Sequence, residues 1–241
     1  MSVDQDAASR GEASERPRVR VWDGPTRLFH WSLVILIALA YATRKANPDL
    51  VWHMRIGYAI LILITFRILW GFVGSSTSRF SAFAYAPWTA IRYGIDFLLR
   101  RPRHFLGHNP LGGTVVFILL GLVAAQGLLG LFSYDDHTDL HGGPLTSKVS
   151  EATVALATRW HIWLFDILLI VIALHILASF AYAIWKREDL IGPMITGRKR
   201  RKDFEDQSEA QIASPLMALL CLILAAAIVL GGITLAGGKI G

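Results

Sequence analysis

Charged residues and cysteines are scarce in this sequence, and each scarcity excludes a class of protein. Charged residues make up 17% of the 241 residues and hydrophobic residues 54%, with a mean hydropathy of +0.46, whereas soluble domains usually carry about 25% charged residues. The single cysteine, Cys221, lies in an apolar run, so the chain alone builds neither a disulfide framework nor a cysteine-ligated zinc or iron-sulfur site. The composition predicts a membrane protein whose metal chemistry would use histidine.

The N-terminal residues do not predict a signal peptide. Residues 1–17 are polar, with no compact apolar segment and no small-residue cleavage site, so we expect residues 1–18 to form a disordered cytoplasmic tail. The net charge of +6 does not indicate nucleic acid as a partner, because the lysines and arginines cluster between apolar segments. They are typical of residues that set membrane topology.

Five apolar stretches approach or meet the roughly 17 to 25 residues that a membrane-spanning helix needs. They cover residues 27–44, 52–73, 112–133, 160–185 and 214–236. Between the second and the third, residues 85–99 predict a short amphipathic helix on the membrane surface, next to several arginines. Its apolar stripe consists of Trp88, Ile91, Ile95 and Leu98.

The loops differ in charge, and the difference predicts orientation. The segments before the first stretch, after the second and after the fourth are rich in arginine and lysine, whereas residues 133–158 carry four acidic residues against Lys148 alone. Lysine and arginine in short loops stay on the cytoplasmic side. We therefore expect a multi-pass protein of the bacterial inner membrane with its N-terminus cytoplasmic and its C-terminus periplasmic, although Arg44 and Lys45 would lie outside.

Four of the eight histidines lie in or at the ends of the apolar stretches: His30, His53, His161 and His175. His161 and His175 are 14 residues apart, which in a helix is about 40° short of four turns and a rise of about 21 Å. Both would face one side, near opposite membrane surfaces. His30 would share the depth of His175, and His53 that of His161. Each pair could supply the two axial ligands of a haem iron.

Other residues are weaker candidates. Arg67, 14 residues after His53, would lie at the depth of the cytoplasmic pair and could bind a haem propionate or lie at the interface with its charge in water. Arg55 and Arg159 flank the outer pair. His137 and His141 could form an outer metal site or be solvated, and His104 and His108 are assigned no chemistry. The glycines of the third stretch, more simply explained by helix packing, are Gly112, Gly113, Gly121, Gly127 and Gly130.

Several motifs resemble the bacterial cytochrome b561 family, which is related to the cytochrome b subunits of nickel-iron hydrogenases. The resemblance covers residues 19–199. The motifs are residues 21–31 (VWDGPTRLFHW), 52–58 (WHMRIGY), 67–74 (RILWGFVG), 135–136 (DD), 143–145 (GPL) and 193–197 (PMITG). The resemblance implies a four-helix bundle holding two haems b, with His30, His53, His161 and His175 at the ligand positions.

The predicted architecture is an all-α integral membrane protein: a four-helix dihaem domain (residues 19–197), a charged cytoplasmic linker (198–213) and an additional transmembrane helix (214–241). The fifth helix departs from the family and suits a neighbouring subunit. The family implies electron exchange with the quinone pool, through ubiquinol or menaquinol, and a periplasmic cytochrome c or other redox subunit as partner. A membrane complex or a homodimer is compatible with this pattern.

Three functional classes remain open at this point. The first is an electron carrier between the quinone pool and a periplasmic partner, including a haem-bearing anchor of a hydrogenase-like complex. The second is a quinol-dependent oxidoreductase that acts on a small periplasmic acceptor such as superoxide. A scaffold or transporter without haem would explain the helices and basic loops but not the four histidines.

Overall fold

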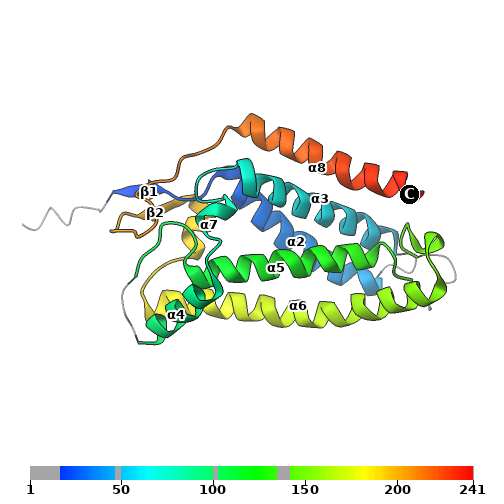
Figure 1. Cartoon of the computed structure of the whole chain (residues 1–241), viewed down its shortest axis with the longest axis horizontal. Coiled ribbons are helices and arrows are strands. Elements are labelled where there is room, and N and C mark those ends of the chain that lie inside the picture. The colour runs from blue at the N-terminus through cyan, green and yellow to red at the C-terminus, as the bar shows by residue number, and fades with distance from the viewer. Residues whose placement is uncertain (1–16, 47–49, 100–102, 135–141, 241) are drawn as a thin grey trace, which may run out of the picture.

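Long helices that run roughly along one axis make up most of the structure (Figure 1). The computed structural model describes residues 17–46, 50–99, 103–134 and 142–240. Five helices in this part of the chain are long and apolar enough to cross a membrane, which confirms the prediction of a multi-pass membrane protein. They are α2 (Gly24–Ala46), α3 (Val51–Val73), α5 (Pro110–Gly130), α6 (Glu151–Trp185) and α8 (Pro215–Leu235).

The helix α6 is longer than the apolar stretch within it. It begins at Glu151, where the side chain of Ser150 accepts a hydrogen bond from the Thr153 amide, whereas the apolar run predicts a start near residue 160. Its 35 residues correspond to about 52 Å at 1.5 Å per residue, against a hydrocarbon core of about 30 Å. Hydropathy detects only the part of a helix that is apolar enough to lie in lipid, so the first turns of α6, before residue 160, were not predicted.

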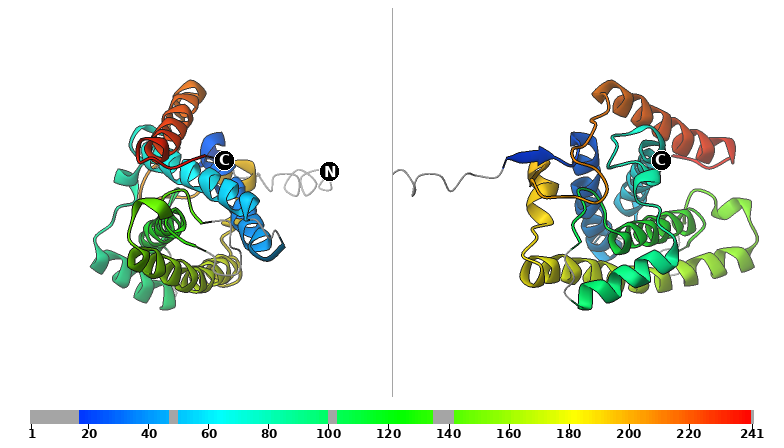
Figure 2. Two further views of the ribbon diagram at one scale, coloured as in Figure 1. Left: turned by 90° about the vertical axis from the view of Figure 1, so that its right-hand side faces the viewer. Right: turned by 60° about the vertical axis from the view of Figure 1, so that its left-hand side comes forward.

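The helices pack in an order that places α8 outside the bundle. Helix α2 packs against α3, α5 against α6, and α3 against both α5 and α8. Seen end-on, α8 lies along α3 on the side away from α6 (Figure 2). Small residues of α8 (Ala218, Cys221 and Ala225) belong to the same buried cluster as Trp70 of α3. Cys221 therefore serves as a small apolar contact residue, as predicted.

Side chains bridge the space between α6 and the first two helices. In the described residues, close backbone packing between α6 and either α2 or α3 is marginal at most. Tyr41 of α2 instead stacks on Phe165 of α6, with ring centroids 5.5 Å apart. Elsewhere α6 presents exposed apolar residues such as Ile170, Leu174 and Leu177, as expected for a lipid-facing helix. The histidines that the sequence pairs come from these loosely packed helices.

Two short strands close one end of the bundle, called here the strand end. Strand β1 (Arg18–Arg20) pairs antiparallel with β2 (Arg198–Arg200), and α7 (Ile191–Thr196) lies beside them (Figure 1). Gly197 ends α7 with a φ of 77°, which favours glycine, and its carbonyl accepts a hydrogen bond from Val21. The predicted linker 198–213 thus contains β2 and returns along the bundle, with further hydrogen bonds between Ser76 and Gln211.

The other end, called the loop end, carries a short 3₁₀ helix η2 (Thr146–Lys148) between α5 and α6. A second 3₁₀ helix, η1 (Phe80–Ala82), follows α3 near the strand end. The predicted N-terminal tail up to residue 16, and the third-loop residues Asp135, Asp136, His137, Asp139 and His141, lie outside the described residues.

The amphipathic segment forms a helix, α4 (Pro87–Leu98), near the strand end. Its inner face buries Ala90 and Tyr93, and Tyr93 packs on Phe105 with ring centroids 5.7 Å apart. The apolar stripe faces outward, since Trp88 and Leu98 are 73% and 74% exposed. The predicted helix and its two faces are thus present.

Candidate functional site

His53 and His161 face each other at the loop end. Their ring centroids are 6.2 Å apart and the rings are nearly perpendicular, at 87°. The Nδ1 atom of His53 is hydrogen-bonded to the carbonyl of Ala40 at 2.9 Å, and that of His161 to the carbonyl of Gln126 at 3.0 Å. These bonds orient both rings and place the proton on Nδ1, which leaves the lone pair of Nε2 available to a metal.

The separation of these rings fits a metal between them. Two metal–nitrogen bonds of about 2 Å each, plus about 1 Å from each Nε2 to its ring centre, give about 6 Å between centroids. On the His161 side, Nε2 makes only a long contact of 3.4 Å with the Gln126 amide. The ring separation of the loop-end pair is therefore compatible with two axial imidazoles on one haem iron.

His30 and His175 lie together at the strand end, on α2 and α6. They are close enough for the charge of His175 to act on the His30 ring. The Nδ1 atom of His30 is buried without a hydrogen-bond partner in the described part of the chain, and its ring packs edge-on against Trp31 at 5.0 Å. The two histidines expected to pair by helix depth thus lie within electrostatic reach of each other. At least one of their rings lacks the backbone hydrogen bond that both loop-end rings have.

Arg67 lies inside the bundle near the strand end. It is 3% exposed, and its Nη1 atom has no hydrogen-bond partner among the residues described. Its guanidinium lies over two aromatic rings, with Cζ 5.0 Å from the Phe80 centroid and 5.8 Å from that of Phe83. An arginine that lies at the membrane interface with its charge in water would be exposed, so this geometry favours the alternative in which Arg67 binds an anionic group.

His108 also belongs to this region, although the sequence assigned it no chemistry. Its ring packs between Phe83 and Trp22, with centroids 4.5 and 4.7 Å away, and its Nδ1 atom is buried without a partner in the described residues. Burial, followed by the nearby Arg67 and His175, lowers the pKa of His108 to about 3. The residue was missed because it precedes α5 in a loop, where helix depth and spacing give no signal.

The polar residues of the first motif have a structural role. Asp23 accepts hydrogen bonds from the Thr26 amide at 2.6 Å, the Ser78 hydroxyl at 2.9 Å and the Trp70 indole at 3.3 Å. The first of these caps the N-terminus of α2. Asp23 is 2% exposed and Ser78 0%, so the network fixes α2 to α3 at the level where His30 enters the bundle.

The arginines expected at the outer pair lie on the surface. Arg55 and Arg159 are both exposed, and the Arg55 guanidinium lies 5.4 Å from the ring centroid of Trp52. Their predicted part in binding a cofactor stays a prediction.

Glycine allows the backbone of α5 to approach its neighbours. A Cβ atom at Gly130 would lie 3.1 Å from Cε1 of His161, and one at Gly127 would lie 2.7 Å from Leu61. At Gly121 nothing lies within 4 Å. The glycines thus include close packing contacts, as expected, and one of them adjoins a candidate ligand.

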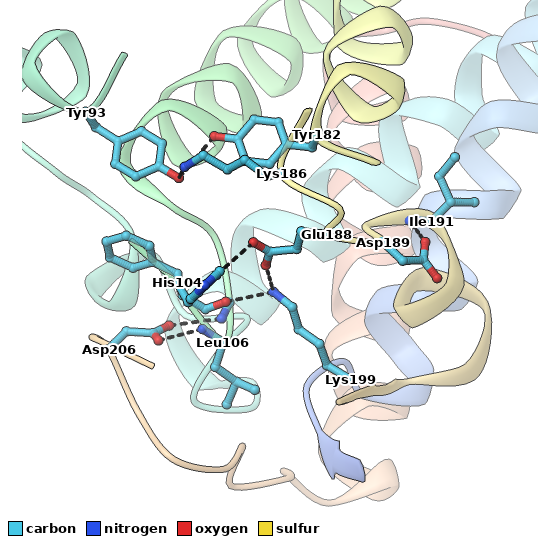
Figure 3. A network of polar contacts seen from close by, with 12 residues as sticks. Tyr93, His104, Leu106, Tyr182, Lys186, Glu188, Asp189, Ile191, Lys199 and Asp206 are labelled. Carbon is cyan, nitrogen blue, oxygen red and sulfur yellow. Dashed lines mark hydrogen bonds and ion pairs between the residues drawn. The ribbon is translucent and has the colours of Figure 1, made fainter. Parts of the chain in front are cut away.

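A buried ion pair holds the strand end together (Figure 3). Glu188, which follows α6, pairs with Lys199 of β2 and contacts Nδ1 of His104 at 3.2 Å. Lys199 also donates to the carbonyl of Phe105 at 2.8 Å. Both partners are under 10% exposed. The pair ties the α4–α5 connection to the strands but does not touch the candidate ligands directly.

Apolar spanning helices with histidines near both ends are typical of membrane cytochromes of the b type, which bind haem b and transfer electrons. The comparison with protein families agrees, because the model of the prokaryotic cytochrome b561 family matches residues 21–197. The chain belongs to this family. In the described residues, groups of three or more histidine, cysteine or acidic side chains that could hold a single metal ion are absent.

Curated relatives carry a more specific name. The chain is 27% identical to a probable Ni/Fe-hydrogenase B-type cytochrome subunit of Bradyrhizobium diazoefficiens, over 81% of this chain and 92% of that relative. It is 24% identical to the protein of that name in Rhizobium leguminosarum bv. viciae, over 83% and 97%, and 25% identical to that of Cupriavidus necator, over 83% and 94%. No solved structure matches the chain significantly.

Proposed function

We propose that the protein carries two haems b and transfers electrons between the membrane quinone pool and a redox partner at the periplasmic face. The observation that carries the proposal is the loop-end pair, His53 and His161, whose ring separation of 6.2 Å suits one iron between two imidazoles. His30 and His175 would hold the second haem at the strand end. Two axial protein ligands leave no open position on iron, which favours electron transfer over oxygen chemistry.

The proposed orientation puts the strand end in the cytoplasm. Arginines at positions 18, 20, 198 and 200 are exposed there, and basic residues are retained on the cytoplasmic side. The chain would span the inner membrane with its N-terminus inside and its C-terminus outside. The loop-end pair then lies near the periplasmic face, where a cytochrome c or another redox subunit would exchange electrons with it.

A hydrogenase-like complex is the partner that the relatives favour, since all three named above are called hydrogenase cytochrome subunits. Helix α8 supports an assembly of this kind. Its face away from α3 exposes apolar residues, including Leu219, Leu220 and Ile223, which suits contact with lipid or with a membrane helix of the partner. A complete complex would pass electrons between the periplasmic subunit and the quinone through both haems.

The proposal is tested on the purified full-length protein in detergent. We expect a dithionite-reduced minus oxidised spectrum of b type, two haems per chain by the pyridine haemochrome method, and haem reduction when a short-chain quinol is added. The variant His104→Gln, whose histidine contacts Glu188 and not the paired histidines, is the matched control and should keep both haems. A protein without haem would overturn the proposal.

The quinol measurement also separates the two functional classes. An electron carrier should be reduced by quinol and stay reduced until a protein acceptor is added. Reoxidation by superoxide alone, at the rate of turnover, would instead favour the quinol-dependent oxidoreductase.

A further inference from the structure

Two unpaired polar side chains meet at the ring of Phe83. Arg67 reaches it from α3, with Cζ 5.8 Å from the ring centroid, and His108 reaches it from the loop before α5, with ring centroids 4.5 Å apart. The Nη1 atom of Arg67 and the Nδ1 atom of His108 are both buried, and both lack a hydrogen-bond partner among the described residues. Buried polar atoms are nearly always hydrogen-bonded, so two such atoms around one ring indicate a missing partner, which for Arg67 must be an acceptor.

The available acidic groups do not fill this role. Asp23 is the carboxylate that acts electrostatically on Arg67, but its oxygens already accept bonds from Thr26, Ser78 and Trp70. Glu188 is paired with Lys199. The guanidinium is a donor only, so the missing group must supply lone pairs, and it should be anionic to compensate the buried positive charge.

The position of Arg67 and His108 in the bundle indicates which anion would bind between them. His108 lies within electrostatic reach of Arg67, His175 and His30, which are the guanidinium and the two proposed ligands at the strand end. A haem held by His30 and His175 would bring its own carboxylates into this region. Gly113 at the start of α5 helps to form it, because a Cβ there would lie 2.5 Å from the carbonyl oxygen of Phe83.

We propose that Arg67 and His108 together bind one propionate carboxylate of the haem at the strand end, with the arginine supplying charge and the histidine a second hydrogen bond from Nδ1. This inference rests on the proposed function, because it requires a haem between His30 and His175. It assigns His108 to the cofactor site. Positive charge and hydrogen-bond donors next to the strand-end haem would favour its reduced form and so raise its midpoint potential.

The test is a spectroscopic redox titration of the full-length protein and of His108→Phe, with resonance Raman spectra of the propionate bending region. Phenylalanine keeps the aromatic packing against Phe83 and Trp22 but removes the donor. We expect two haems per chain in both proteins, a lower midpoint potential for one haem of the variant, an unchanged potential for the other, and a shifted propionate band. Arg67→Leu should lower the same potential further, because it removes the full charge.

Two variants serve as controls. His104→Gln lies in the same loop but faces Glu188, so both potentials should stay at their original values. His108→Asn places an amide donor near the position of Nδ1 and should return the midpoint potential most of the way to its value in the unaltered protein. This variant separates the loss of a hydrogen bond from a packing defect if His108→Phe folds poorly.

The outcomes distinguish this inference from the proposed function. A full-length protein that binds no haem overturns both. Two haems with unchanged potentials and an unchanged propionate band in His108→Phe overturn the propionate site alone. The same spectra combined with slower reduction by a short-chain quinol would assign the two donors to the quinone, and would likewise overturn the propionate site.

Discussion

The two histidine pairs are built differently, although the same helix α6 contributes to both. At the loop end, the Nδ1 atoms of His53 and His161 are held by the carbonyls of Ala40 and Gln126. At the strand end, Nδ1 of His30 is buried without a partner in the described chain, and so are single nitrogens of Arg67 and His108. The difference teaches that backbone carbonyls alone can orient the histidines of one pair, whereas the other pair lies beside polar groups that have no hydrogen-bond partner within the described chain.

If the proposed two-haem arrangement is correct, the largest expected effects come from removing one proposed ligand of each pair. His175→Ala should abolish haem binding at the strand end, and His161→Ala should abolish it at the loop end, because an iron with a single protein ligand is held less tightly. Any haem that remained at the altered site would have a spectrum distinct from that of the six-coordinate form. Haem per chain should fall from two to one in each variant. If either substitution removes both haems, the two sites are not independent and the comparison fails.

A second large effect is expected for the buried ion pair of the strand end. Glu188→Gln should lower the free energy of unfolding by about 3 kcal/mol, since it leaves the Lys199 ammonium buried without its counter-charge. The measurement is thermal unfolding of the detergent-solubilised protein, followed by the temperature at which haem is released. Glu205→Gln is the matched control, because Glu205 pairs with Arg103 but is 40% exposed, and such surface pairs contribute about 1 kcal/mol or less. Equal losses of stability in the two variants would contradict the conclusion that the buried pair of Glu188 and Lys199 stabilises the strand end.

The same carboxylate predicts a pH dependence confined to the strand end. Burial alone would raise the pKa of Glu188, but Lys199 and His104 outweigh it and hold the pKa below the usual 4.5. A depressed carboxyl pKa stabilises the fold above the unfolded pKa, and this contribution is lost as the pH falls through the lower folded value. Hydrogen exchange in residues 186–200 should therefore accelerate as the pH falls below about 4.5, after correction for the intrinsic exchange rate.

Hydrogen exchange at the loop end gives the contrast, because η2 and the first turns of α6 contain no such buried ion pair in the part that the structure describes. Their protection should vary less over the same pH range. In Glu188→Gln, hydrogen exchange at the strand end should no longer accelerate at low pH. If the acceleration persists in this variant, another titrating group causes it.

The smallest expected effect tests how closely α5 supports the loop-end site. Gly130→Ala should displace His161 by a few tenths of an ångström, because the new Cβ would lie 3.1 Å from Cε1. We expect a shifted spectrum for one haem with both haems retained. Gly121→Ala, where nothing lies within 4 Å, should leave the spectrum unchanged and stabilise the helix by up to about 1 kcal/mol. Identical spectra for both variants would show that Gly130 is only a packing residue.

The sequence by itself determined the class of protein and the candidate ligands. Runs of about 20 apolar residues have few stable solutions other than helices in a lipid bilayer, because the backbone must satisfy its own hydrogen bonds there. Helical geometry then relates residue number to depth. That is why the spacing of His161 and His175, set against the starts of α2 and α3, predicted the two pairs, and why the motifs around them predicted the family.

Only the tertiary structure decided what surrounds those pairs. The early start of α6 at Glu151, the burial of Arg67 against Phe80 and Phe83, and the approach of His108 depend on contacts between segments far apart in the chain. Periodicity describes one helix at a time and says nothing of a loop residue that folds back over another helix. Burial and hydrogen-bond satisfaction are properties of such long-range contacts, and for that reason they emerge only when the helices are packed together.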